Sequence, residues 1–506
     1  MCPTPIILAG RARVTDRAPS CPGAVLAVIL TAYLMIVLDL SIILTGLPEI
    51  GETMSLDPVA LSWVHNAYLL SFGGILLLAA RLGDLVGRRR MLRTGIALFT
   101  VASLGVGVAV SPLALIGARA VQGVGAAILA PSVLSILAAT FAEGDDRSRA
   151  LAWYSMVAGA GTSLGLVLGG IFAGLLSWRI GFLINVPIGI VLWLLTGRVI
   201  PESTRQTAPL DLFGPIASTL GMVALVYGIV RSADHGWGDA GTLASLACAG
   251  LLLLAFIRYE ATAKAPLLPL SLFRDATRSS AYVSRMLFIG PAVAFFYFGT
   301  QLMQDVLGYT PVQAGLGFLP MTVVTFMVAL ALPRITARTG SAPVLAAAFL
   351  AMAAGLFWLA SAGPQANYWS DLALPMAVIG VGNGGALAPL TSFGVYRVPE
   401  KDHGAASGLV NVAHQLGGSI GLGIFVVVFA AAATPTSPTG SLPEQIGAVF
   451  YSASFLCAIG LVLTLLFIQP GERRALGALL PHSLKGTPNE SDSDAWSRRR
   501  PFRDRR

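Results

Sequence analysis

The sequence has 506 residues, of which 55% are hydrophobic and only 11% are charged, and its mean hydropathy is +0.76. A water-soluble domain carries about 25% charged residues, so this chain cannot cover a surface that faces water on all sides. The net charge of +8 predicts no nucleic-acid partner, because the basic residues lie in short connections between apolar runs. The composition therefore predicts an all-α membrane protein.

Fourteen apolar runs follow one another along the chain, and each is long enough to cross a bilayer as a helix. They lie near residues 23–47, 59–80, 91–111, 113–139, 151–174, 179–199, 212–230, 241–258, 281–304, 312–333, 342–361, 372–395, 404–431 and 446–468. The first run is too long for the core of a cleavable signal peptide. The pattern predicts fourteen transmembrane helices.

Basic residues orient these helices, because short cytoplasmic loops are enriched in Lys and Arg. They precede the first run and follow each even-numbered run before the last, as at Arg88 after the second and Arg147 after the fourth. The opposite connections are mainly acidic, with Arg179 and Arg231 as the main exceptions. The distribution predicts that both termini are cytoplasmic.

An internal repeat divides the chain. Aligning Gly87 with Gly340 places Arg81 over Arg334, each after an even-numbered helix. Internal repeats around a central substrate path are common in secondary transporters. We expect a cytoplasmic segment 1–22, two six-helix halves at 23–200 and 281–468, an inserted helix pair at 212–258 and a disordered cytoplasmic tail at 471–506.

Charge concentrates in ARLGDLVGRRRML, residues 80–92, between the second and third runs. This segment resembles the cytoplasmic loop motif of the major facilitator superfamily, G-x-L-x-D-x-x-G-R-[KR], with Ala80 in place of the first glycine. An aspartate and arginines at helix ends can form charge-assisted bonds between helices. We expect a conformational latch that also fixes topology, with a topology signal alone as the alternative, at Arg81, Gly83, Asp84, Gly87, Arg88 and Arg89.

Asp39 and Arg119 stand inside apolar runs, where ionisable residues are costly and usually functional. LDLSIILTGLP (38–48) and RAVQGVGAA (119–127) resemble helix motifs of the fourteen-helix drug:proton antiporter branch of that superfamily. SWRIGFLINVPIG (177–189), LGYTPVQAGLGFLP (307–320) and GAASGLVNVAHQLGGSIG (404–421) also resemble segments of this branch. The resemblance implies that Asp39 and Arg119 couple transport to protons. A salt bridge that only fixes packing is the alternative.

The fifth run carries glycines at a spacing of four residues in GTSLGLVLGG, residues 161–170. Small residues at this spacing let helices approach closely. The segment resembles the antiporter motif G-x-x-x-G-P-x-x-G-G and implies a role in antiport for Gly161, Gly165, Gly169 and Gly170. Leu166 occupies the proline position, which leaves uptake by symport and ordinary packing open.

The thirteenth run carries a polar stripe at helical spacing, which we expect to face a cavity. In this run, the predicted cavity-lining residues are Asn411, His414 and Gln415. Two more are predicted on other runs, Gln122 on the fourth and Asn383 on the twelfth. His414 either takes part in coupling, since histidine titrates near neutral pH, or is a packing residue. The stripe holds no carboxylate, which disfavours a multiply charged cationic substrate.

No cofactor or metal site is predicted. The four cysteines show no paired spacing, and none of the three lysines is followed by the Ser or Thr of a nucleotide-binding loop. Since the five histidines are scattered, a polytopic enzyme or sensor remains a remote alternative, and the chain is predicted not to be an enzyme.

The leading hypothesis is a secondary transporter that exports amphipathic small molecules, such as drugs or antibiotics, in exchange for protons. Metabolite uptake by proton symport is the alternative. The resemblance implies a multi-pass protein of the bacterial cell membrane that works as a monomer, with the small-molecule substrate, protons and the lipid bilayer as its partners.

Overall fold

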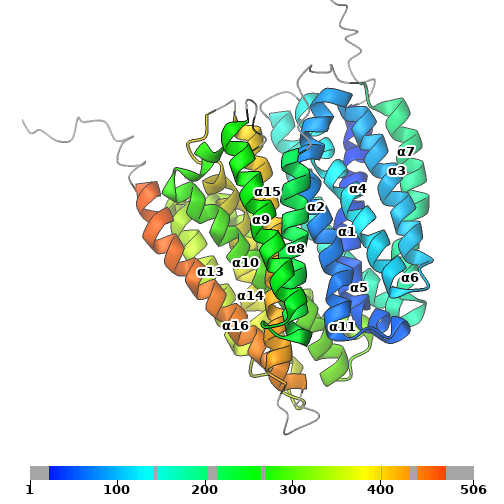
Figure 1. Ribbon diagram of the computed structural model, residues 1–506, viewed down its shortest axis with the longest axis vertical. Helices are drawn as coiled ribbons and strands as arrows, with labels where there is room; N and C mark the ends of the chain where they lie inside the picture. The colour runs from blue at the N-terminus through cyan, green and yellow to red at the C-terminus, as the bar shows by residue number, and fades with distance from the viewer. Residues whose placement is uncertain are drawn as a thin grey trace, which may run out of the picture.

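The computed structural model describes residues 22–141, 145–202, 213–263, 266, 268–399, 402–433 and 442–473. Every regular element within these ranges is a helix, as Figure 1 shows. The predicted N-terminal segment up to residue 21 and the predicted tail beyond Arg473 lie outside the described residues.

The helices form two groups with a pair between them in sequence. The first group is α1 (Pro22–Met54), α2 (Pro58–Val86), α3 (Arg88–Gly107), α4 (Pro112–Thr140), α5 (Asp145–Leu175), α6 (Trp178–Leu183) and α7 (Asn185–Val199). The pair is α8 (Phe213–His235) and α9 (Ala240–Thr262). The second group is η1 (Leu270–Phe273), α10 (Ala276–Gln301), η2 (Leu302–Val306), α11 (Pro311–Gly317), α12 (Leu319–Thr339), α13 (Ser341–Leu359), η3 (Tyr368–Ala373), α14 (Leu374–Gly394), α15 (His403–Ala431), α16 (Leu442–Leu463) and η5 (Thr464–Ile468).

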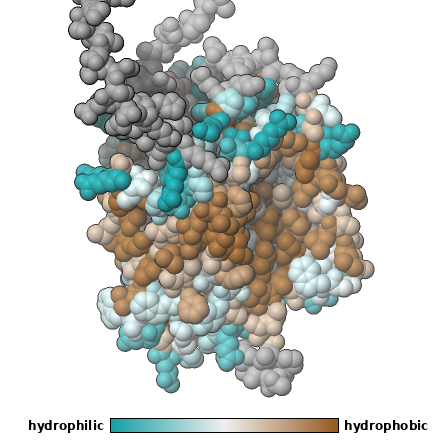
Figure 2. Space-filling view, turned by 90° about the vertical axis from the view of Figure 1, so that its left-hand side faces the viewer, coloured by the Kyte–Doolittle hydropathy of each residue, from teal (hydrophilic) through white to brown (hydrophobic). Residues whose placement is uncertain are grey.

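Thirteen helical spans in the described part are long and apolar enough to cross a membrane. The helix α3 is not among them, because the arginines in its first turns lower its hydropathy. Counting α3 as a span gives the fourteen that the sequence predicts. Figure 2 shows the matching surface, with an apolar band between polar ends.

Two predicted runs are each interrupted by a turn residue in the structure, and several bounds differ by a few residues. The run 179–199 is split between α6 and α7, and the run 312–333 between α11 and α12. Pro187 stands in the first turn of α7 and Pro320 in that of α12. Because proline has no backbone N–H, each interrupts the helical hydrogen bonds and favours a new helix start.

The alignment of Gly87 with Gly340 has a structural counterpart. Both glycines have positive φ, 109° and 86°. Gly87 lies between α2 and α3 and Gly340 between α12 and α13, which is between the second and third span of each group. A side chain at Gly87 would collide with Glu202, which follows α7, and one at Gly340 would press on Glu472, which follows η5. In both groups, therefore, a glutamate at or just beyond the end of the last span contacts the turn between the second and third spans.

The pair α8 and α9 is attached through α8, which contacts both α2 and α15 (Figure 1). Thr219 of α8 meets Gly74 of α2, and Val226 and Val230 of α8 pack near Gly423 of α15. The described helices thus form two six-helix halves, with α6 and α7 or α11 and α12 counted as one span, plus an inserted pair.

The two basic exceptions to the loop rule both have local partners. Arg231 Nε lies 2.7 Å from Asp239 Oδ2, and this hydrogen bond lowers the pKa of Asp239 to about 2. Arg179 Nη1 donates to the carbonyls of Gly107 and Ala109, at 3.2 Å and 2.6 Å. Their charges serve bonds within the protein, so they do not argue against the predicted orientation.

Candidate functional site

The carboxylate of Asp39 lies at the centre of a buried polar network in the first half. Asp39 on α1 and Arg119 on α4 are both 0% exposed, and Arg119 Nη1 lies 2.6 Å from Asp39 Oδ2. Gln122 Nε2 donates to Asp39 Oδ1 at 2.6 Å, and Asn185 Nδ2 of α7 donates to the same oxygen at 3.4 Å. Three helices therefore converge on one carboxylate.

The guanidinium of Arg119 is enclosed by α2 and by aromatic rings. Its Nε donates to the carbonyl of Val64 at 3.1 Å. The guanidinium carbon lies 4.4 Å from the ring centre of Tyr68 and 5.5 Å from that of Phe182. Cation–π contacts of this kind stabilise a desolvated arginine. The side chains of Asp39 and Arg119 are thus enclosed together, away from water.

Three buried polar atoms near this pair have no hydrogen-bond partner within the described chain. They are Nη2 of Arg119, the hydroxyl of Tyr68 and Nδ1 of His65. Buried polar groups are nearly always satisfied, and an unsatisfied one costs free energy that a rearrangement or a water molecule can recover. The network therefore holds three polar atoms that a water molecule or a rearrangement of the helices could satisfy.

Sequence reasoning placed Asp39, Arg119 and Gln122 as candidates but missed three residues of the network. Ser103 accepts a hydrogen bond from Gln122 at 2.8 Å, and Asn185 and Tyr68 contact the ion pair. Asn185 belongs to the motif-like segment 177–189, where a polar residue at a helix start was the available signal. Ser103 and Tyr68 lie inside apolar helices and outside the motif-like segments, so nothing in the sequence singled them out.

The prediction that Gln122 lines a cavity is wrong for this conformation. Its side chain is 0% exposed, and it bridges Asp39, Arg119 and Ser103 inside the first half. Gln122 shares one face of α4 with Arg119, three residues earlier, and that face points into the half itself. We assign it to the network around the carboxylate.

The glycines of α5 make two different contacts. Side chains at Gly161, Gly165 and Gly169 would collide with residues of α1, whereas one at Gly170 would collide with the carbonyl of Pro311 at the start of α11. A side chain at Gly315 of α11 would in turn collide with the carbonyl of Leu166. The glycine stripe therefore packs within its half, and Gly170 belongs to a seam between the halves.

We call this contact of α5 with α11 the glycine seam (Gly170, Pro311, Gly315 and Leu166). It lies at the end of the bundle opposite Gly87, where Gln304 Nε2 also donates to the carbonyl of Thr45 at 3.0 Å. Tyr297 donates to the carbonyl of Pro58 at 3.3 Å at the same end. Figure 1 shows α11 beside α5 there. The halves are therefore bonded to each other at this end.

We expect Gly315→Val to open the glycine seam, because two backbones in contact leave no room for a branched side chain. A single cysteine introduced as Gln304→Cys should then react several-fold faster with a membrane-impermeant thiol reagent added from outside. Gly250→Val is the matched control, since an added atom at Gly250 meets nothing within 4 Å. Unchanged labelling of Gln304→Cys in the Gly315 variant would show that the seam does not close this end.

The predicted latch residues lie at the arginine-rich end of the bundle. Arg88 Nη1 donates to the carbonyl of Ser135 on α4, and Arg89 and Arg90 each place Nε 3.5 Å from Glu202 Oε2. Gly83 accepts a bond from the backbone N–H of Gly87 at 3.2 Å. The described arginine bonds thus join helices of the first half.

The structure gives no interhelical bond for the two remaining latch residues, Arg81 and Asp84, among the described side chains. Arg81 lies partly exposed near the end of α2, and the side chain of Asp84 lies outside the described residues. Their roles stay predictions.

The polar stripe of α15 divides along its length. Ser407 and Asn411 are exposed, His414 is partly exposed and bonded to Arg285, and Gln415 is buried against Gly73 of α2. Asn383 on α14 is partly buried, with Nδ2 3.9 Å from the sulfur of Met321. The stripe therefore has an exposed part and a part that contacts the other half.

The exposed part of this stripe faces the region between the halves. Gly408, on one side of Asn411, packs on Leu77 of α2, and His414, on the other side, contacts Arg285 of α10. Because α2 and α10 belong to different halves, the face between these two contacts lies where the halves meet.

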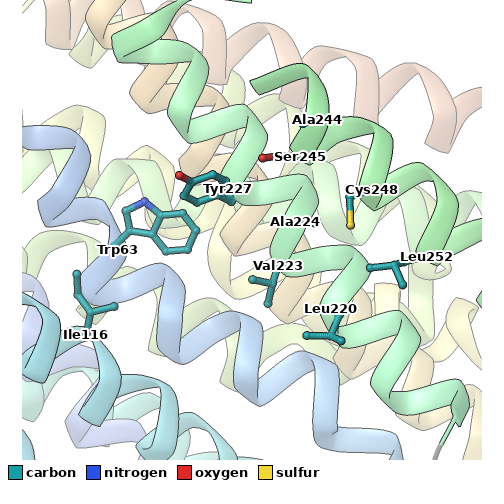
Figure 3. Close-up of a pocket in the computed structure, with 10 residues that line it drawn as sticks. All are labelled: Trp63, Ile116, Leu220, Val223, Ala224, Tyr227, Ala244, Ser245, Cys248 and Leu252. Carbon is teal, nitrogen blue, oxygen red and sulfur yellow. The ribbon is translucent and has the colours of Figure 1, made fainter. Parts of the chain in front are cut away.

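An apolar cavity lies elsewhere among the described residues. It has a volume of about 780 Å³, with Trp63 of α2 and Ile116 of α4 on one wall and residues of α8 and α9, such as Tyr227 and Cys248, on the other (Figure 3). None of its lining residues belongs to the network around Asp39. It is a groove between the first half and the inserted pair.

No group of three or more His, Cys, Asp or Glu side chains within the described ranges could hold a metal ion.

Two six-helix halves that contact each other at one end, and an ionisable pair within the membrane, are typical of a polytopic transporter of the alternating-access class. Residues 29–422 match the family described as Major Facilitator Superfamily. The chain belongs to the major facilitator superfamily.

Relatives extend this match over most of the chain. The sequence is 38% identical over 460 residues to the cephamycin export protein CmcT of Amycolatopsis lactamdurans, covering 89% of this chain and 94% of that protein. It is 34% identical over 449 residues to the puromycin resistance protein pur8 of Streptomyces alboniger, covering 87% and 88%. A third relative is the tetracenomycin C resistance and export protein of Streptomyces glaucescens, 31% identical over 413 residues and covering 81% and 76%.

Solved structures agree on the fold. The peptide transporter POT in complex with sulfate superposes with a TM-score of 0.65 at 16% identity, covering 91% of this chain and 96% of that one. The nucleoside transporter NupG superposes with a TM-score of 0.60 at 12% identity, covering 88% and 99%. At these identities the likeness shows the fold alone. The predicted fold class is confirmed.

Proposed function

We propose that this protein exports amphipathic small molecules across the cell membrane in exchange for protons. The observation that carries the proposal is the carboxylate of Asp39, which is fully buried and ion-paired in the first half. The names of three relatives support the direction, since they are described by antibiotic export or resistance. Leu166 stands at the proline position of the antiporter motif, and α5 packs closely on α1 and α11 without that proline.

Proton binding is coupled to helix movement through the free-energy cost of leaving Arg119 buried without its counter-ion. While Asp39 is ionised, Arg119 neutralises it and the two helices stay together. Protonation removes the attraction and leaves the arginine as an uncompensated charge, which is unfavourable away from water. The first half then rearranges toward a state that hydrates or re-pairs Arg119, and the returning deprotonation restores the starting packing.

The energy source is the proton gradient. Each charge that crosses the membrane contributes about 2.3 kcal/mol per 100 mV, which is enough to drive accumulation of a neutral or singly charged substrate. The glycine seam would separate the substrate path from the outside while the exposed part of the α15 stripe receives substrate from the cytoplasm. Opening the seam would release it.

We propose that the end with Gly87 and Gly340 faces the cytoplasm and that both termini lie on that side. The segments 1–22 and 471–506 would then be cytoplasmic, and the halves 23–200 and 281–468 would rock about α2 and α15. We further propose that the protein works as a monomer, because each half contributes its own part of the path.

Cysteine labelling tests this orientation. In a background without the native cysteines, we expect Arg89→Cys to be protected from an impermeant reagent in intact cells. We expect Asp57→Cys and Asp239→Cys to react, because both residues cap helices at the opposite end. A cysteine at the buried position 457 is the unreactive control. Equal labelling of positions 89 and 239 from outside would show that a span between them is miscounted.

A further inference from the structure

The second half contains a buried cation that the proposed coupling does not use. Arg285 of α10 is 7% exposed. Its Nη1 donates to the carbonyl of Leu387 and to the hydroxyl of Thr391, each at 3.0 Å, and its Nη2 lies 3.2 Å from Nδ1 of His414. Its Nε is buried and has no partner within the described chain. The guanidinium is therefore held in place by uncharged groups only.

The other buried arginines show what is missing at this position. Arg119 is paired with a carboxylate at 2.6 Å. Arg278, two turns earlier on α10, bonds three backbone carbonyls at the end of the bundle. None of the ion pairs among the described residues includes Arg285. A buried cation without a counter-ion costs free energy that an anion would recover.

Arg285 also lies beside the face where the halves meet. Its partner His414 continues the stripe of Ser407 and Asn411 on α15, and both of those residues are exposed. Thr391, its partner on α14, is exposed as well. An anionic group that moves along this face would meet a row of uncharged hydrogen-bonding groups and then the guanidinium.

We propose that Arg285 binds the carboxylate of an anionic amphipathic substrate, so that this class is favoured over neutral and cationic molecules. The planar guanidinium matches a carboxylate with two parallel hydrogen bonds. The edge formed by Nε and Nη2 receives it, because Nη1 is already bonded to α14 while Nε is free. The contact between Nη2 and the imidazole of His414 is replaced by a hydrogen bond from Nη2 to the incoming carboxylate. This assignment rests on the proposed export function and names its substrate class.

The test uses the full chain in nanodiscs and three fluorescent probes with one apolar group. These are pyrenebutyrate, its uncharged amide and a pyrenebutyl trimethylammonium cation. We expect the protein to bind pyrenebutyrate about tenfold more tightly than the amide, as a charge-assisted hydrogen bond implies. Arg285→Met should reduce the affinity for pyrenebutyrate to that for the amide and leave the amide unchanged.

Two further variants separate recognition from structure. Arg285→Lys, which keeps the charge but not the planar fork, should retain only part of the preference. Arg278→Met is the matched control on the same helix. It should keep the full preference for pyrenebutyrate over the amide, even if the variant is less stable. Amide binding shows that each variant is folded. A preference that persists in Arg285→Met, or no preference for pyrenebutyrate in the unmodified protein, would overturn the proposal.

Transport in inverted vesicles distinguishes this proposal from the export function. Proton-driven accumulation of the amide or of the cation, without anion preference, would support export and remove the role of Arg285. Anion preference in the nanodisc assay without accumulation of any probe would support the role of Arg285 and contradict export.

Discussion

Asp39→Asn should abolish proton-driven accumulation while leaving the protein able to exchange substrate. Asparagine keeps the size and hydrogen bonds of the protonated acid, so the network can form but cannot release a proton. In inverted vesicles, a pH difference of one unit supplies about 1.4 kcal/mol per proton, or a tenfold concentration ratio. We expect the ratio to fall to about one in the variant.

The matched control is Asp57→Asn. Asp57 accepts the N–H of Ala60 at 2.7 Å as the cap of α2, and asparagine caps a helix equally well. Accumulation by this variant should match that of the unmodified protein. Full gradient-driven accumulation by Asp39→Asn would remove this carboxylate from the mechanism.

Arg119→Met should strongly lower the yield and thermal stability of the folded protein. It leaves the carboxylate of Asp39 buried without its cation, and breaking a buried pair in this way costs roughly 3–5 kcal/mol. The double replacement with Asp39→Asn removes both charges and should recover most of the stability. Arg334→Met is the control, because Arg334 is exposed and its loss should have little effect on stability.

The double variant separates the two roles considered for this pair. If the pair couples transport, the double variant is folded and still exchanges substrate, but it does not accumulate it. If the pair only fixes packing, the double variant regains both its yield and its accumulation. Scanning fluorimetry and vesicle transport on the same preparations measure the two quantities.

The sequence by itself determined the class, the number of spans and the key ionisable residues of the first half. Length and hydropathy are local properties of a helix in a bilayer, where every backbone group must be satisfied within its own segment. A charge inside such a run stands out for the same reason. The same reasoning applies to Arg285, which lies inside the predicted run 281–304.

Only the tertiary structure decided which residues meet. The partners of Asp39 lie on two other helices, α4 and α7, and Gly170 packs on the second half although its neighbours in the stripe pack on α1. Periodicity identifies the face of a helix but not the helix that covers it, because tilt and rotation are set by contacts between segments far apart in sequence. For that reason the sequence predicted Gln122 as a cavity residue, whereas packing buries it against the carboxylate of Asp39.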